Sequence, residues 1–276
     1  MFDRLPALLD LARRIGWGAG DILYQAEQTF KIEKSGDSPV TSADLAANQH
    51  ILSGLVSALG DADFAYLTEE TYSPDQTDRL NHPWVWVIDP LDGTKDFINH
   101  TGDYAVHIAL VHEGRPVLAV VAAPAKGRLY STIAGQGSYV ETKGNARERV
   151  QVSDRTDPST MVLLASRSHR NEALEKLIEH LPHGSTESVG SVGGKVAAIV
   201  DQFADIYLSI SGKSAPKDWD FAAPDLILTE AGGQITHFDG TPLIYNREDV
   251  QQWGGILATN GQCHSLLCEK AMAIGI

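Results

Sequence analysis

The sequence predicts a mixed α/β protein, with an α+β first half and a second half in which strands and helices alternate. Three observations lead to this fold class: amphipathic helical patterns open the chain, a run of strand patterns follows, and alternating strand and helix patterns occupy the rest. A glycine-containing stretch that ends near Val150 marks the change between the two patterns. We therefore predict two domains, residues 1–150 and residues 151–276.

Two helices are expected first. Residues 8–26 repeat apolar side chains at helical spacing, which indicates one long amphipathic helix. After a polar break over residues 34–39, Thr41 and Asp44 fit the capping-box pattern that begins a helix. The side chains expected to face the core from this second helix are Leu45, Ile51, Leu52, Leu55 and Leu59.

Strand patterns rich in β-branched and aromatic residues dominate the middle of the chain. Glu113-Gly114 predicts a hairpin turn between two of them. In the second half, strands alternate with helices, and Gly232-Gly233 is expected to end one helix. The predicted strands are 65–68, 85–88, 105–111, 117–122, 128–132, 162–165, 206–209, 234–237 and 255–258, and the helices of the second half are 172–180, 194–203, 222–231 and one that closes the chain.

Length, charge and cysteine content restrict the class of protein. The chain has 276 residues, 43% of them hydrophobic, which is enough for a large core. A net charge of −14 argues against binding to a nucleic-acid polymer or an anionic membrane. No apolar run approaches the roughly 20 residues of a membrane span, and the first residues do not resemble a signal peptide. With only two cysteines, which indicate free thiols, we expect a cytoplasmic protein.

A buried strand that ends in two carboxylates carries the strongest chemical signal. Asp89 and Asp92 fall at the carboxyl end of this strand, where open α/β sheets place their ligands. A type I turn is the structural alternative. We favour a metal site, because two carboxylates this close repel each other without a cation, and the Leu91 carbonyl offers another oxygen ligand. Gly93-Thr94 then opens a helical turn whose free N–H groups suit a phosphate.

Three further acidic positions have two interpretations each. Glu69-Glu70 follows a short strand and is either a solvated turn or a source of one metal ligand, for which we favour Glu69. Asp220, at the start of a helix, is either an N-cap or a ligand from the second half. Asp44 is either part of the capping box or a base that acts with Thr94 to orient the attacking water.

Two motifs in this order resemble the signatures of the lithium-sensitive, magnesium-dependent phosphomonoesterase superfamily, which includes inositol monophosphatase. The first is Asp-Pro-Leu-Asp-Gly-Thr at residues 89–94, and the second is Trp-Asp-Phe-Ala-Ala-Pro-Asp at residues 219–225, continuing to Glu-Ala-Gly-Gly at 230–233. The resemblance covers nearly the whole chain and implies a layered α/β/α/β/α sandwich. It implies two or three Mg²⁺ ions held by Glu69, Asp89, the Leu91 carbonyl, Asp92 and Asp220, with Asp44, Thr94 and Glu69 as catalytic residues.

Within this superfamily, the sequence is most similar to the CysQ-type 3′(2′),5′-bisphosphate nucleotidases. The similarity is carried by Lys95-Asp96-Phe97 and by the segments at residues 103–110 and 166–169. It implies hydrolysis of the 3′-phosphate of 3′-phosphoadenosine 5′-phosphate to AMP and phosphate. The substrate contacts that it implies come from Asp92, Gly93, Thr94, Ser191, Lys195 and Asp220.

Two segments depart from the nucleotidase pattern and leave the substrate open. The loop before Lys195 is one residue longer than usual, and the stretch at residues 204–219 is also longer. The alternatives are an inositol monophosphatase or another sugar-phosphate phosphatase on the same scaffold and, more remotely, a metal- or phosphate-binding regulator without turnover. In each case the partner is a small phosphorylated molecule, and both a monomer and a homodimer are compatible with the sequence. Candidates to bind a second phosphate are Arg167, Arg170, Lys195, Lys213 and Lys217, with His169 for the adenine.

Overall fold

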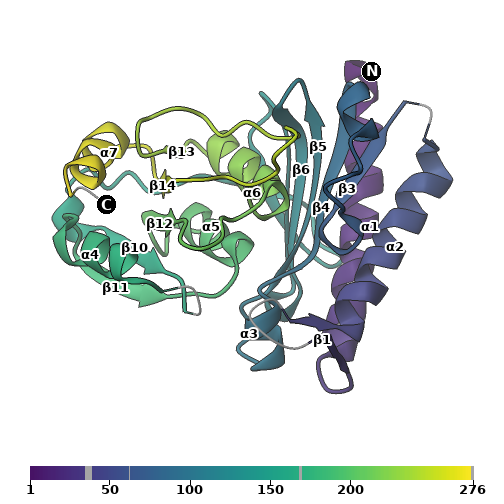
Figure 1. The fold of residues 1–276 in the computed structure, drawn as a ribbon, viewed down its shortest axis with the longest axis horizontal. Coiled ribbons are helices and arrows are strands. Elements are labelled where there is room, and N and C mark those ends of the chain that lie inside the picture. The colour runs from purple at the N-terminus through teal and green to yellow at the C-terminus, as the bar shows by residue number, and fades with distance from the viewer. Residues whose placement is uncertain (35–38, 62, 168–169, 275–276) are drawn as a thin grey trace.

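Two large β-sheets and three layers of helices build the chain, of which the computed structural model describes residues 1–34, 39–61, 63–167 and 170–274 (Figure 1). Helices α1 and α2 cover one face of a seven-stranded sheet, and α5 and α6 lie between this sheet and a five-stranded one. Helices α4 and α7 cover the outer face of the five-stranded sheet. The layer order is therefore α/β/α/β/α, which confirms the predicted fold class.

The two N-terminal helices are where the sequence places them. Helix α1 spans Leu5–Ala26 and α2 spans Ser42–Leu59. Thr41 is the N-cap of α2 and forms the predicted capping box with Asp44. The inward direction expected for Leu45 is wrong, because the buried face of α2 follows Ala43, Ala47, Ile51 and Leu55 and leaves Leu45 45% exposed.

The seven-stranded sheet belongs to the first half of the chain and has the order β3-β4-β5-β6-β7-β8-β9. Only β3 and β4 are parallel, and the other pairs are antiparallel. Its last two strands were not predicted, because their glycines and charges obscure the alternation of apolar and polar residues. The strands are β3 Ala65–Thr68, β4 Trp84–Asp92, β5 Ala105–His112, β6 Arg115–Ala123, β7 Arg128–Ile133, β8 Ser138–Thr142 and β9 Glu148–Val150, and a separate pair is formed by β1 Ile32–Lys34 and β2 Val40–Thr41.

The five-stranded sheet has the order β11-β10-β12-β14-β13 and belongs to the second half. Strand β11 was missed, because its residues Ser185–Ser188 are polar and form an exposed edge. The other strands are β10 Val162–Ala165, β12 Ile206–Ile210, β13 Gln234–His237 and β14 Gly255–Thr259. The helices are α3 Thr94–Ile98, α4 Glu172–His180, α5 Val192–Val200, α6 Asp218–Glu230 and α7 His264–Ala273, with short 3-10 helices at Phe2–Arg4, Glu69–Thr71, Asp78–Asn81, Pro124–Lys126 and Pro158–Thr160.

Three clusters of buried apolar side chains separate the layers. The central cluster combines residues of both sheets with α5 and α6, for example Val121, Phe221 and Ile256. The predicted division into 1–150 and 151–276 coincides with the change from one sheet to the other, since β9 ends at Val150, and it remains a prediction.

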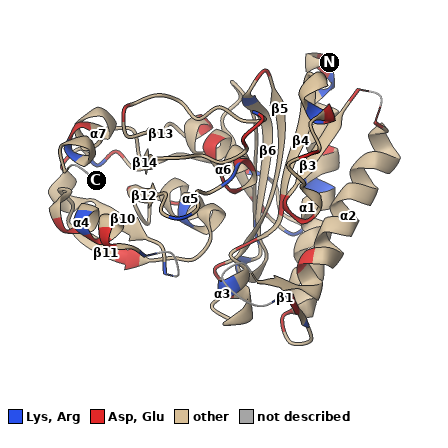
Figure 2. Cartoon of the chain, viewed as in Figure 1, with Lys and Arg blue, Asp and Glu red and all other residues tan. Residues whose placement is uncertain are grey.

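The structure also bears on the free thiols that the cysteine content predicted. Neither Cys263 nor Cys268 forms a disulfide, and both are free thiols. Lys and Arg are interspersed with Asp and Glu in both halves of the chain (Figure 2). Among the described residues, no helix combines the length and the apolar character that crossing a bilayer requires.

Candidate active site

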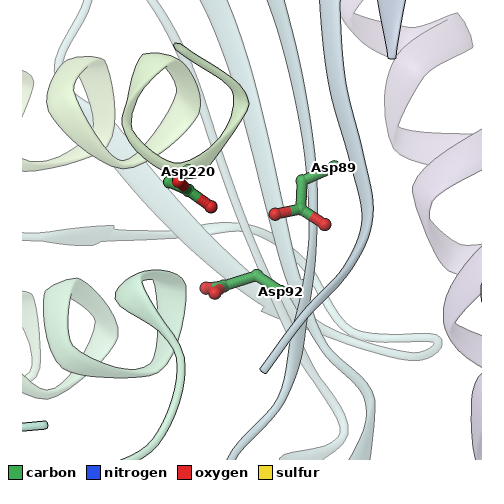
Figure 3. Close-up of side chains that lie close together, drawn as sticks. All are labelled: Asp89, Asp92 and Asp220. Atoms are coloured by element: carbon green, nitrogen blue, oxygen red, sulfur yellow. The ribbon is translucent and has the colours of Figure 1, made fainter. Parts of the chain in front are cut away.

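Three carboxylates from distant parts of the chain converge between the seven-stranded sheet and α6. Asp89 and Asp92 come from the end of β4, and Asp220 comes from the first turn of α6. One carboxylate oxygen of each lies within 4.8 Å of the others, and the three side chains point toward one another (Figure 3). The structure therefore brings together three of the predicted metal ligands.

An irregularity in β4 explains how two of these residues face the same way. Residues three apart in a regular strand point to opposite faces of the sheet. In β4 the pairing with β5 shifts, so that Asp89 lies opposite His107 while Asp92 lies opposite Ala105. This bulge adds one residue and turns both carboxylates toward α6. The type I turn considered as an alternative is wrong, because these residues belong to strand β4, in which the Leu91 amide donates to Asp89 Oδ1 at 3.0 Å.

Mutual repulsion and burial raise the pKa of most acids in this cluster. Burial is the largest cause for Asp89, followed by the charges of Glu69, Asp92 and Asp220, and its pKa lies well above the usual range. Burial and the charge of Asp92 raise the pKa of Asp220 to about 6. Oxygen ligands that repel one another in a buried site suit a hard divalent cation.

Asp92 differs from the other acids, because its pKa is lowered. Burial raises it, but the facing imidazole of His107 and the Gly193 amide outweigh this effect. The Gly193 N–H donates to Asp92 Oδ2 at 2.9 Å, and His107 Nε2 lies 3.2 Å from the same oxygen.

The two adjacent glutamates, Glu69 and Glu70, have different neighbours. Strand β3 runs parallel to β4, with Thr68 beside Ile88, so the 3-10 helix that follows β3 lies next to Asp89. The side chain of Glu69 remains accessible to solvent, yet burial of its carboxyl group, followed by the charges of Asp220 and Glu70, raises its pKa to about 8. Burial and the charge of Asp44 raise the pKa of Glu70 to about 7. Of the two, Glu69 is therefore the neighbour of the acidic cluster.

Asp44 has both of the contacts that the sequence left as alternatives. Its Oδ2 accepts the Thr41 amide at 2.9 Å, which completes the helix cap. Its Oδ1 accepts the hydroxyl of Thr94 at 3.2 Å. The same hydroxyl lies 3.2 Å from the Leu91 carbonyl, so the predicted water-activating pair lies directly beside a predicted carbonyl ligand. Burial raises the pKa of Asp44.

Asp220 forms a hydrogen bond at the start of its own helix and also faces the acidic cluster. Helix α6 begins at Asp218, and Lys217 is its N-cap, so the N-cap interpretation of Asp220 is wrong by position. Asp220 is the third residue of α6, and its Oδ2 accepts the Lys217 amide. This bond fixes the carboxylate at the positive end of the helix.

Gly93 and Ser191 bring the two halves of the chain into contact. Gly93 has a left-handed backbone conformation with φ of 91°, and a Cβ there would lie 2.9 Å from the Asp103 carbonyl oxygen. The same Cβ would lie 3.1 Å from that of Ser191, so glycine allows this close approach. Ser191 is the N-cap of α5, and its hydroxyl accepts the Gly194 amide at 2.7 Å.

Lys195 is buried rather than free to bind a ligand from solution. Its Nζ donates to the Ser191 carbonyl at 2.7 Å and lies 5.0 Å from the centre of the Tyr207 ring. Burial lowers its pKa to about 8, although the charges of Asp92 and Asp96 oppose this effect. Lys195 thus contributes a positive charge behind the acidic cluster.

Two of the other basic candidates for a second phosphate already pair with acids. Arg167 already bonds Asp96 and Asp103, the latter at 2.8 Å. Arg170 pairs with Glu175 on the surface. The Nζ of Lys217 lies 5.4 Å from the centre of the Trp219 ring, and Lys213 is exposed, while His169 lies outside the described residues.

Sequence reasoning missed the roles of His107 and of the Asp96–Asp103 pair. The signal was present, since His107 interrupts an apolar strand, where a buried polar residue calls for a partner. A separate cavity of about 840 Å³ lies among β13, the following loop and α7, and it contains none of the predicted site residues. We place the site by its chemistry, because Asp239, Glu248 and Asp249 line that cavity without forming a cluster of potential metal ligands among the described residues.

Comparisons with known proteins agree with this geometry. Residues 5–275 match the model of the inositol monophosphatase family. The chain belongs to the inositol monophosphatase family. Within the family, it is 33% identical over 242 residues to the 3′(2′),5′-bisphosphate nucleotidase CysQ of Escherichia coli (strain K12), which is 86% of this chain and 94% of that protein.

Two other members of the family extend the comparison. The chain is 34% identical to a 3′-phosphoadenosine 5′-phosphate phosphatase of Mycobacterium bovis, covering 84% of this chain and 81% of that protein. The solved structure of CysQ from Bacteroides thetaiotaomicron superposes with a TM-score of 0.76 and 30% identity over 92% of this chain and 97% of that one. The fold of the chain is thus that of the family.

Proposed function

We propose that this protein is a Mg²⁺-dependent phosphomonoesterase that hydrolyses the 3′-phosphate of 3′-phosphoadenosine 5′-phosphate, releasing AMP and phosphate. The observation that carries the proposal is the cluster of Asp89, Asp92 and Asp220 beside the Thr94–Asp44 hydrogen bond. Relatives named for this activity, at 33% and 34% identity over most of the chain, support the choice of substrate.

The acidic cluster suits divalent cations. Its ligand atoms are all oxygens, and burial together with the neighbouring acids raises the pKa of Asp89 and Asp220, so a bound cation would favour their ionised forms. We propose that two or three Mg²⁺ ions bind there, and that they supply the Lewis acid that stabilises negative charge on the reacting phosphate. The proposed ligands are Glu69, Asp89, the Leu91 carbonyl, Asp92 and Asp220.

Thr94 and Asp44 are proposed to take the proton of the attacking water. The Thr94 hydroxyl donates its hydrogen to Asp44, so its oxygen keeps a lone pair for the water. As the water attacks, its proton moves to Thr94 and the threonine proton moves to Asp44. Burial raises the pKa of Asp44, which makes this carboxylate a stronger base than one in water. We include Glu69 among the proposed catalytic residues, since it is a neighbour of the acidic cluster.

The phosphate is proposed to bind where the two halves meet. The amides of Gly93 and Thr94 open α3 and are oriented to hold phosphate oxygens. Ser191 lies against Gly93 from the second half, and Lys195 adds its charge from behind. Asp92 and Asp220 complete the proposed set of substrate contacts.

A substrate panel tests the proposal. The protein is incubated with 3′-phosphoadenosine 5′-phosphate, inositol 1-phosphate or fructose 1,6-bisphosphate, in Mg²⁺ or in EDTA, and released phosphate is measured. We expect fastest release from the nucleotide, AMP as the other product, and no release in EDTA. Faster cleavage of inositol 1-phosphate would move the assignment to an inositol phosphatase. If no substrate is turned over, the assignment would move to a metal- or phosphate-binding regulator without catalytic activity.

A further inference from the structure

His107 lies at a junction between the two segments that carry the acids. Its side chain comes from β5, an inner strand of the seven-stranded sheet, and is fully buried. Its Nδ1 lies 3.1 Å from the Trp219 carbonyl, directly before Asp220, and its Nε2 lies 3.2 Å from Asp92 Oδ2. One imidazole ring therefore touches the end of β4 and the first turn of α6.

The groups around the ring indicate which of its nitrogens carries a hydrogen and which carboxylate oxygen it contacts. The Trp219 carbonyl only accepts hydrogen bonds, so Nδ1 carries a hydrogen. Asp92 Oδ2 accepts the Gly193 amide at 2.9 Å, and the Nε2 edge of the ring packs against the same oxygen at 3.2 Å. The ring and the Gly193 amide therefore both restrict the position of the Asp92 carboxylate, which converges with Asp89 and Asp220.

The packing around His107 requires a glycine in the first turn of α5. A Cβ on Gly193 would overlap His107 Nε2, and it would lie 2.9 Å from Ala105 Cβ and 3.0 Å from Val121 Cγ1. A residue without a side chain is therefore needed at position 193 for the start of α5 to approach the ring. The histidine in β5 and the glycine in α5 form one packing unit.

We propose that His107 is a positioning residue that orients the Asp92 carboxylate and holds the first turn of α6 at the distance at which Asp92 and Asp220 bind the same cation. This inference rests on the proposed metal site. Groups that hold a metal-binding carboxylate typically affect metal affinity about 10–100-fold. His107 acts through Asp92 and Trp219 and touches no reacting atom.

Metal binding without substrate tests this role directly. The probe is Mn²⁺, whose free concentration is measured by electron paramagnetic resonance with wild-type protein, His107→Ala and His107→Asn. We expect His107→Ala to bind Mn²⁺ about 10–100-fold more weakly and His107→Asn, which keeps one N–H donor, to lie between. In hydrolysis assays, the Mg²⁺ concentration for half-maximal rate should rise by a similar factor, while the KM for substrate at saturating Mg²⁺ changes less than threefold.

A matched control separates orientation of the acids from a general disturbance of β5. Because His107 acts through Asp92 and Trp219, weaker Mn²⁺ binding by folded His107→Ala reports a lost orientation of these groups. His112→Gln is the matched control, because His112 lies on the same strand and bonds the Pro83 carbonyl at 2.9 Å, away from the acids. It should leave Mn²⁺ affinity unchanged. Melting temperatures in EDTA check that each variant is folded.

Three outcomes would overturn the proposal. Unchanged or tighter Mn²⁺ binding by folded His107→Ala would show that the ring does not position Asp92. Equal weakening by His112→Gln would show a general effect of disturbing β5. If wild-type protein binds no Mn²⁺, the metal site itself is wrong and the role of His107 is refuted with it, whereas failure confined to His107→Ala leaves the proposed function intact.

Discussion

Two groups of carboxylates lie close to each other in this protein but differ in how their charge is balanced. Asp96 and Asp103 both bond Arg167, and Asp103 also pairs with Lys126 at 3.4 Å. Burial alone would raise the pKa of Asp103, but its bonds to Arg167 and to the Gly190 amide lower it below the usual value.

The other group lacks this balance. For Asp89, Asp220 and Glu69, burial and mutual repulsion raise the pKa values. The protein thus pairs one group of acids with cations and, among the described residues, gives Asp89, Asp220 and Glu69 no ion pair. The difference indicates that the unbalanced group is completed from solution, which is why we assign it to metal binding and the balanced group to structure.

Neutralising one acid of each group gives the largest expected difference. Asp89→Asn should lower Mg²⁺-dependent hydrolysis roughly 100–1,000-fold, or about 3–4 kcal/mol, because it removes a ligand charge. Asp103→Asn should lower the rate less than about tenfold, because Arg167 keeps its bond to Asp96. Phosphate release at saturating substrate measures both. Similar losses in the two variants would erase the distinction between the groups.

Metal should stabilise the protein through the unbalanced group alone. At a Mg²⁺ concentration 100 times the dissociation constant, we expect a gain of about 2.7 kcal/mol in the free energy of unfolding. For a protein of this size, this gain corresponds to a rise of roughly 5–10 °C in the melting temperature. Asp89→Asn should remove most of this rise, while its amide oxygen keeps the bond to the Leu91 amide. A full rise in that variant would place the cation elsewhere.

Without metal, stability should fall as pH rises, through the raised pKa values. An acid whose pKa is higher in the folded state binds more protons there than in the unfolded chain, so raising the pH through this interval costs stability. For Asp220, with a pKa of about 6, the cost is on the order of 1–2 kcal/mol between pH 5 and pH 8. Urea unfolding in EDTA measures it as the difference between wild type and Asp220→Asn. A difference that is independent of pH contradicts this account.

The smallest expected effect concerns the balanced group. Arg167→Gln should lower the free energy of unfolding by about 1–2 kcal/mol, because it leaves the buried Asp96 without its cation. Arg170→Gln is the matched control, since its pair with Glu175 lies on the surface, and it should cost less than about 0.5 kcal/mol. Denaturant melts of both variants provide the measurement. If the two costs are equal, the bond between Arg167 and Asp96 adds nothing beyond a surface pair.

Features that depend on neighbouring residues could be predicted from the sequence. The long helix α1, the capping box at Thr41 and the presence of strand β4 follow from local patterns, and the structure confirms each, although β4 continues to Asp92 instead of ending at Ile88. The convergence of Asp220 on Asp89 and Asp92 required the resemblance, because no local pattern relates residues so distant in the chain.

Features that depend on tertiary contacts could not be predicted. The shift in pairing between β4 and β5 decides which way Asp92 faces, and the pattern of the strand does not predict it. Likewise, Arg167 looked available for a phosphate, because its partners Asp96 and Asp103 are more than 60 residues away in sequence. The polar edge strand β11 lacks an apolar pattern and depends on its neighbour β10.

The central apolar cluster has a consequence for how the chain can be divided. Because α5 and α6 come from the second half but cover the inner face of the first sheet, a fragment of residues 1–150 would expose Ala109, Ala119 and Val121 to water. Such a flat apolar surface promotes aggregation. We expect the fragment to be insoluble when expressed alone and to be rescued by co-expression of residues 151–276, so a gene split at this point would work as a two-part complementation reporter.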